Sequence, residues 1–160
     1  MLGIFKKNKE IEIFSPMSGI KKELSDVPDN AFSEKMLGDG AAVLPNSKEI
    51  YCPVTGVITD ITDTKHAFCI ITDDKTEILL HIGINTVNLK GEGFKVFAKV
   101  NDRISVGEKI AEVDLELLKQ HGIPLDTPVL VMEPEHYEIK QNNIENLCGG
   151  KDVLFTLRKK

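Results

Sequence analysis

The chain has 160 residues, which fits one domain large enough to bury a core. With 41% hydrophobic residues, 28% charged residues and a net charge of −5, it is neither disordered nor suited to nucleic acid, because phosphate binding requires clustered Lys and Arg. No stretch approaches the ~18 apolar residues of a membrane span, and the N-terminus lacks the apolar run of a signal peptide. We therefore expect a cytoplasmic protein with no nucleic-acid partner and at most indirect membrane contact.

The cysteines agree with a reducing compartment. Cys52, Cys69 and Cys148 are odd in number and widely spaced, with no C-x-x-C pair, so neither a disulfide framework nor a zinc knuckle fits. Cys69 lies in an apolar run and is expected to be a small core residue.

Residues 1–10 form a short basic segment with three lysines and a few apolar residues. We expect a flexible terminus here, in preference to a tail that lies on a membrane surface. No Pro- or Ser-rich linker follows, so residues 11–160 are predicted to be a single domain.

Short runs rich in Ile, Val, Thr and Phe alternate with Gly, Pro, Asn and Asp about every ten residues, a pattern typical of many short strands. The predicted strands are 11–14, 19–24, 41–44, 49–51, 56–61, 66–72, 76–82, 94–99, 109–113, 129–132 and 153–157. This arrangement predicts an all-β fold, an antiparallel sandwich or barrel.

Helix is predicted in only a few places. Asp114 is a helix N-cap before residues 115–119, and Gly122 ends that helix. Residues 29–37 could hold one or two turns before Gly38, and residues 134–137 carry a weaker helical signal.

One segment is echoed later in the chain. Ser15-Pro16-Met17-Ser18-Gly19-Ile20 resembles Cys52-Pro53-Val54-Thr55-Gly56-Val57, 37 residues on, and in each a Pro precedes a Gly turn into an extended run. The echo suggests a sandwich of two related halves, although two common turns could also produce it.

The most informative stretch is a predicted hairpin. Two apolar runs, 66–72 and 76–82, flank the turn signal Asp73-Asp74-Lys75. If the turn is centred between Asp73 and Asp74, the core face pairs Ala67 with Leu80, Cys69 with Ile78 and Ile71 with Thr76. The other face then pairs His66 with His81, Phe68 with Leu79 and Ile70 with Glu77. The two imidazoles would share one face, about 4.5–5.5 Å apart at Cβ.

Two facing imidazoles could bind a metal ion, yet two ligands are too few for a tight zinc site. Glu77 is four residues from His81 on the same strand, so its Cα lies ~13 Å away. His121 and His136 are distant in the chain, and His121 is better explained as a residue at a helix end.

Nucleophilic catalysis suits the pair better. One neutral imidazole can attack phosphorus while its protonated neighbour donates a hydrogen bond to a phosphoryl oxygen. Thr64 and the backbone around Gly83 could fix the two tautomers. No Walker-type loop or kinase signature is present, so the phosphoryl group should arrive on another protein.

The motifs together resemble the glucose-family enzyme IIA of the bacterial phosphoenolpyruvate-dependent sugar phosphotransferase system, over roughly Ile13 to Leu157. The resemblance rests on Gly38-Asp39-Gly40, Cys52-Pro53-Val54-Thr55-Gly56, Thr64-Lys65-His66-Ala67-Phe68, Glu77-Ile78-Leu79-Leu80-His81-Ile82-Gly83 and Leu89-Lys90-Gly91-Glu92-Gly93-Phe94.

This resemblance implies a duplicated β-sandwich of the hybrid-motif type that serves as a phosphocarrier and requires no cofactor. His81 would accept the phosphoryl group from the histidine phosphocarrier protein and pass it to a cysteine of a IIB domain of a sugar transporter. His66 would hydrogen-bond the phosphoryl group, Thr64 would orient His66, and the backbone of Gly83 would orient His81.

An apolar docking surface is also implied. It maps to Ala31, Phe32, Leu37 and Leu79, with Phe68 beside Leu79 on the predicted histidine face. In some family members the same surface docks regulatory targets, and a zinc ion can join the two histidines to a partner carboxylate.

The sequence departs from the family pattern at three positions. Asn85 and Asn88 stand where acidic residues are usual, which weakens the expected salt bridges with basic residues of the phosphocarrier protein. Thr62 stands where some members have a large apolar docking residue.

Three alternative functions are weighed against the phosphocarrier. A lysostaphin-like zinc peptidase needs a His-x-His element, which does not occur here. A biotinyl or lipoyl carrier needs a lysine in a specific context, and Lys65, Lys75 and Lys95 all lack it. A purely regulatory binding protein could use the same histidine and apolar face.

Overall fold

The computed structural model describes residues 9–160, and these form antiparallel strands with two short α-helices. The strands are β1 (Glu10–Phe14), β2 (Gly19–Lys22), β3 (Asp39–Pro45), β4 (Glu49–Tyr51), β5 (Gly56–Ile61), β6 (Ala67–Ile71), β7 (Glu77–His81), β8 (Phe94–Val96), β9 (Arg103–Ile104), β10 (Lys109–Val113), β11 (Thr127–Val131), β12 (Tyr137–Gln141), β13 (Asn146–Leu147) and β14 (Val153–Lys159). The helices are α1 (Asn30–Ser33) and α2 (Leu115–Gln120), with 3₁₀ turns η2 (Leu24–Asp26), η3 (Thr86–Leu89) and η4 (Pro134–His136).

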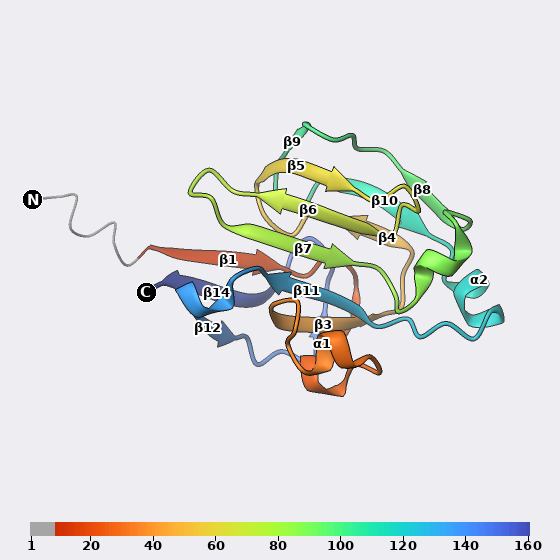
Figure 1. Ribbon diagram of the computed structural model, residues 1–160, viewed down its shortest axis with the longest axis horizontal. Coiled ribbons are helices and arrows are strands. Elements are labelled where there is room, and N and C mark those ends of the chain that lie inside the picture. The colour runs from red at the N-terminus through yellow and green to blue at the C-terminus, as the bar shows by residue number, and fades with distance from the viewer. Residues whose placement is uncertain (1–8) are drawn as a thin grey trace, which may run out of the picture.

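The strands form three sheets. The large sheet has the order β13-β2-β3-β11-β7-β6-β5-β9, and the two small sheets have the orders β1-β14-β12 and β4-β10-β8. Figure 1 shows β5, β6, β7, β11 and β3 one above another across the front, with β4, β10 and β8 behind them. The sheets are not closed, so the fold is a β-sandwich rather than a barrel.

The main core lies between the large sheet and the two small ones. It joins Phe68 and Leu80 of the large sheet to Ile13 and Leu157 of one small sheet and Ile110 of the other, all fully buried. A second, smaller cluster lies on the opposite face of the large sheet, where the segment between β2 and β3 covers it. Its residues are Leu24, Val27, Phe32, Ala42, Ile84 and Leu130, with Leu79 packed against them.

The echo in the sequence corresponds to two related halves of the fold. The N–H of Phe14 donates to the carbonyl of Pro53, and the N–H of Tyr51 donates to the carbonyl of Pro16, both at 2.8 Å. Residues 14 and 51, like 16 and 53, are separated by the same 37 residues as the two echoed segments. The strand pairing repeats in the same way. Gly56 lies where β5 pairs with β9, and its counterpart Gly19 lies where β2 pairs with β13.

Each α-helix begins at a capping aspartate, of which the sequence predicts only Asp114. The Asp114 carboxylate accepts from the N–H of Leu117 at 3.1 Å at the start of α2, and the Asp29 carboxylate accepts from the N–H of Ala31 at 2.8 Å at the start of α1. The weak helical signal at residues 134–137 corresponds to the 3₁₀ turn η4.

Three strands were not predicted. β9 and β13 have only two residues each, and β12 is a largely exposed edge strand rich in Glu, Lys and Gln, residues with low strand propensity. The predicted strand 94–99 ends at Val96, because the chain turns where the N–H of Lys99 donates to the Asp102 carboxylate.

The N-terminal prediction can be compared with the structure only at its end. Glu10 is the first residue of β1 and pairs with Arg158, so the first strand starts one residue earlier than predicted. Residues 1–8 lie outside the described residues, as do the predictions of a flexible segment and of a membrane-surface tail. Within residues 9–160, no helix has the length and apolar character to cross a membrane.

Candidate functional site

The register predicted for the hairpin of β6 and β7 is wrong by one residue. His81 pairs with Ala67, Phe68 with Leu80 and Ile70 with Ile78. The connecting turn has three residues rather than two, and Lys75 adopts a left-handed conformation with φ of 69°. Turns of this kind are common in hairpins, but a lysine at the left-handed position gives no signal in the sequence.

The corrected register changes which residues are exposed. Phe68 is fully buried in the main core, so its predicted place on the exposed docking surface is wrong. Ile70 is likewise fully buried, whereas Cys69 is only half-buried and faces the same side as Leu79 and His81. The predicted assignment of Cys69 to the core face is therefore also wrong.

The two imidazole rings nevertheless lie together. Their centroids are 4.8 Å apart and their planes are nearly perpendicular, at 78°. His66 precedes β6, which begins at Ala67. Its side chain therefore need not follow the alternation of side chains between the two faces of the strand. It ends a tight turn in which Lys65 has φ of 64°, and this turn directs the His66 ring toward His81.

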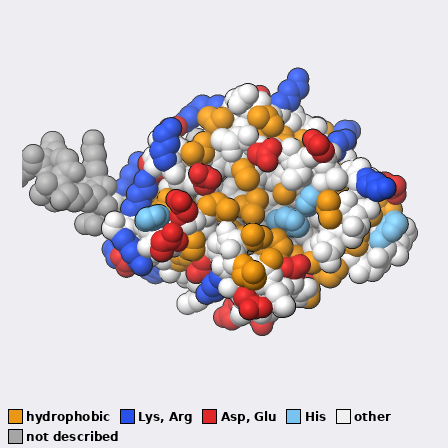
Figure 2. Space-filling model, in the orientation of Figure 1, with side chains coloured by type: hydrophobic (Ala, Val, Ile, Leu, Met, Phe, Trp, Pro, Cys, Tyr) orange, Lys and Arg blue, Asp and Glu red, His pale blue; other side chains and the backbone are white. Residues whose placement is uncertain are grey.

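Helix α1 supplies the apolar side of the site. The Phe32 ring lies 5.0 Å from the His81 ring, centroid to centroid, and only 4% of Phe32 is exposed. The Asp29 cap fixes the start of α1, and the Asp29 carboxylate also acts electrostatically on His81. Figure 2 shows histidine side chains in the middle of this face with hydrophobic side chains beside them.

The Nδ1 atom of each ring has a hydrogen-bond partner. His81 Nδ1 lies 2.8 Å from the carbonyl oxygen of Gly83, an acceptor, so this nitrogen carries the proton and donates it. The lone pair of His81 is then on Nε2. His66 Nδ1 lies 2.7 Å from Thr64 Oγ1, at the position that the sequence suggested for an orienting hydroxyl.

Burial disfavours the charged form of both rings. Burial, followed by the nearby His81, lowers the pKa of His66 to about 4. Burial also lowers the pKa of His81, although the Gly83 carbonyl and the Asp29 carboxylate oppose that shift. These shifts favour two neutral rings in the unphosphorylated protein, whereas the sequence led us to expect one protonated ring.

Two of the predicted docking residues lie beside the pair: the Phe32 ring packs on His81, and Leu79 lies on the same face of β7 as His81. Leu37 is 43% exposed and Leu79 is half-buried, whereas Phe32 is almost covered. Ala31 is half-buried on α1. The sequence prediction missed two exposed apolar side chains on the bordering segments: Met36, which is 71% exposed, and Val87, which is 51% exposed. The run Met36-Leu37 before Gly38 was the available signal for the first.

The structure places the three residues that depart from the family pattern, Asn85, Asn88 and Thr62. Asn85 is exposed and takes a left-handed conformation, with φ of 63°, which Asn tolerates better than most residues. Asn88 is also exposed, on η3. The Thr62 hydroxyl is hydrogen-bonded inside the His66 turn.

The residues of the pair do not complete a metal site alone. His66 and His81 could each offer Nε2, but residues 9–160 contain no group of three or more His, Cys, Asp or Glu side chains placed to hold one ion. Zinc prefers four ligands in a tetrahedron, so a metal here would need ligands from another protein.

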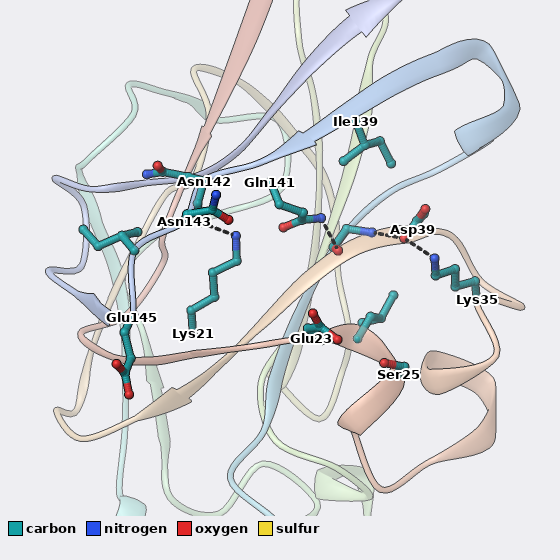
Figure 3. A pocket seen from close by; sticks show the side chains of 13 residues that line it. Lys21, Glu23, Ser25, Lys35, Asp39, Ile139, Gln141, Asn142, Asn143 and Glu145 are labelled. Atoms are coloured by element: carbon teal, nitrogen blue, oxygen red, sulfur yellow. Dashed lines mark hydrogen bonds and ion pairs between the residues drawn. The ribbon is translucent and has the colours of Figure 1, made fainter.

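A separate polar hollow of about 670 Å³ lies between the β2–β3 segment and the strand β12, and the histidine pair does not line it. Figure 3 shows the Lys21 side chain directed into the hollow beside Asn142, with Gln141 bonded to Gly40. Lys21 Nζ donates to the carbonyls of Asn142 and Leu154, and burial lowers the pKa of its amine. These bonds tie β2 to the small sheet and indicate a structural role.

Comparison with known proteins gives the family. Residues 11–137 match the family described as phosphoenolpyruvate-dependent sugar phosphotransferase system, EIIA 1. The chain is 42% identical over 153 residues to the PTS system glucose-specific EIIA component of Buchnera aphidicola subsp. Acyrthosiphon pisum, covering 96% of this chain and 95% of that one. It is 39% identical over 139 residues to the PTS system glucose-specific EIICBA component of Staphylococcus carnosus, covering 82% of this chain and 21% of that one.

A solved structure agrees with this assignment. The glucose permease IIA from Mycoplasma capricolum superposes with a TM-score of 0.87 at 33% identity, covering 93% of this chain and 96% of that one. The peptidase and the biotinyl or lipoyl carrier are thereby set aside. The chain belongs to the EIIA family of the phosphoenolpyruvate-dependent sugar phosphotransferase system.

Proposed function

We propose that this protein is the glucose-type phosphocarrier of its system and that His81 Nε2 carries the phosphoryl group. The group would come from the histidine phosphocarrier protein and pass to the cysteine of a IIB domain. The observation that carries the proposal is the bond between His81 Nδ1 and the Gly83 carbonyl, which leaves the nucleophilic lone pair on Nε2 beside a second imidazole.

The first transfer follows from that tautomer. The Nε2 lone pair attacks phosphorus, a new N–P bond forms, and the N–P bond to the donor histidine breaks with its electron pair returning to the donor ring. His81 keeps its proton on Nδ1, so the ring becomes positively charged. The Gly83 carbonyl and the phosphoryl dianion both face that charge and stabilise it.

The second transfer reverses the bonding at His81. A cysteine thiolate of the IIB domain attacks phosphorus, an S–P bond forms, and the N–P electrons return to Nε2. No proton has to move on His81 in either step. His66 would donate a hydrogen bond from neutral Nε2–H to a phosphoryl oxygen, with Thr64 holding its ring in place.

The apolar residues around the pair fit a docking role. Met36, Leu37 and Val87 are exposed and Leu79 is half-buried, so these side chains offer apolar area that a partner can bury. The same face could bind regulatory proteins. A zinc ion would join the histidines only if such a partner supplied further ligands, and phosphoryl transfer itself needs no metal.

We place the protein in the cytoplasm. Its three cysteines are free in the structure, and Cys148 is exposed, which fits a reducing compartment.

The test is phosphorylation in a defined mixture of phosphoenolpyruvate, the general phosphotransferase and the phosphocarrier protein. Intact mass should show one added phosphoryl group that mild acid removes, as expected for a phosphoramidate. His81→Ala should abolish the addition, whereas His121→Ala, at the exposed end of α2, should leave it unchanged. Normal labelling of His81→Ala would refute the proposal.

A further inference from the structure

Thr62 makes three contacts around His66. Its Oγ1 accepts the backbone N–H of His66 and the backbone N–H of Ala67, each at 3.2 Å, and lies 3.4 Å from His66 Nδ1. The turn is further closed by the N–H of Lys65, which donates to the Thr62 carbonyl at 2.8 Å. Thr62 therefore caps the turn that carries His66 and also reaches its ring.

The two backbone contacts determine the direction of the Thr62 proton. A hydroxyl oxygen has two lone pairs and one O–H. Both lone pairs of Thr62 Oγ1 are directed to N–H groups, so the remaining polar contact, with His66 Nδ1, is the one available to its proton. An O–H that faces Nδ1 requires that nitrogen to be an unprotonated acceptor.

Thr64 does not impose this choice by itself. Its hydroxyl lies 2.7 Å from His66 Nδ1 and makes the shorter bond, but a threonine hydroxyl can rotate to donate or to accept. Thr64 accordingly fits both neutral tautomers of His66. Thr62, whose acceptor capacity is already used by the backbone, favours the tautomer of His66 with its proton on Nε2.

We propose that Thr62 is a positioning residue that sets the tautomer of His66, so that Nε2–H is available to a phosphoryl oxygen. The proposal rests on the phosphocarrier function for its consequence, but the tautomer is a property of the unphosphorylated protein and can be measured by itself. Thr62 touches neither the phosphoryl group nor a partner in this role and acts through His66 alone.

The experiment compares two substitutions of Thr62. Both keep the hydrogen bonds to the backbone of the turn, but they present different groups to the His66 ring. Thr62→Ser keeps a hydroxyl with the same acceptor and donor capacity. Thr62→Asp keeps acceptors for the N–H groups of His66 and Ala67, so the turn remains capped, but presents an acceptor to Nδ1. Thr59→Asp, on the exposed part of β5, controls for the added charge.

The readout is the long-range ¹H–¹⁵N spectrum of the histidine rings, together with the rate of transfer from phosphorylated protein to a IIB domain. Wild type, Thr62→Ser and Thr59→Asp should show His66 protonated on Nε2. Thr62→Asp should move the proton to Nδ1 and slow transfer about tenfold, the usual scale for the loss of an outer hydrogen-bond partner.

Each outcome decides the proposal. A His66 that stays protonated on Nε2 in Thr62→Asp, with the amide signals of the turn unchanged, would overturn it, as would a wild-type ring protonated on Nδ1. If wild-type His81 accepted no phosphoryl group, the proposed function would fail, while the spectra would still decide whether Thr62 sets the tautomer.

Discussion

The rings of His66 and His81 meet although their backbones are not opposite each other. Ala67, not His66, is the cross-strand partner of His81, yet the two ring centroids are 4.8 Å apart. The pair therefore depends on the turn before β6 rather than on the sheet register. Changes in that turn should affect His66 and leave the acceptor His81 largely in place.

Removal of the second imidazole should separate the two transfers. In His66→Ala we expect His81 to be phosphorylated still, because its nucleophilic lone pair is set by Gly83. Transfer onward to a IIB domain should fall about 100-fold, the scale for the loss of one preorganised donor. Rapid-quench measurements of both steps test this, and equal slowing of both steps would contradict the assigned roles.

Phe32 should matter for stability and Met36 for docking. Truncation of Phe32, which is 4% exposed and packs on His81, should cost about 3–5 kcal/mol of unfolding free energy in a urea titration. Met36→Ala, at 71% exposed, should change stability by less than about 0.5 kcal/mol and weaken binding of the phosphocarrier protein. The reverse ranking would show that α1 is not packed as described.

Stability should depend on pH through His66. Its pKa is about 4 in the folded protein and about 6.5 in an unfolded chain, so the unfolded state binds more protons between these values. Stability should therefore be highest above about pH 6.5 and decrease as the pH falls toward 4, by at most about 3 kcal/mol because solvent screens the partly buried ring. Urea titrations of His66→Gln should show a flatter profile in this window, and an unchanged profile would count against a buried neutral His66.

Asn85 tests the electrostatics of docking. Asn85→Asp restores an acid at an exposed left-handed position that Asp also tolerates, so the fold should not change. If the phosphocarrier protein presents basic residues, association should become faster and more sensitive to salt, with a small effect on dissociation. Asn101→Asp, a left-handed exposed asparagine outside the site, is the matched control. Stopped-flow rates equal for the two variants would show that no basic group approaches Asn85.

The sequence predicted an all-β sandwich or barrel, the Asp114 cap of α2 and the adjacency of the two histidines, and its internal echo suggested the two halves. It could not predict the register of β6 and β7, because the three-residue turn depends on Lys75 in a left-handed conformation that lysine does not favour. That single shift moved Phe68 from the surface to the core. The sequence also could not predict the role proposed for Thr62, because that role depends on contacts between its hydroxyl and the backbone of the turn.

The most direct test of the whole account is the ³¹P–¹⁵N coupling in the histidine-labelled, phosphorylated protein. We expect phosphorus coupled to Nε2 of His81, with the Nδ1 proton of the same ring still present and bonded to the Gly83 carbonyl. Coupling to His66, or to Nδ1 of His81, would contradict it.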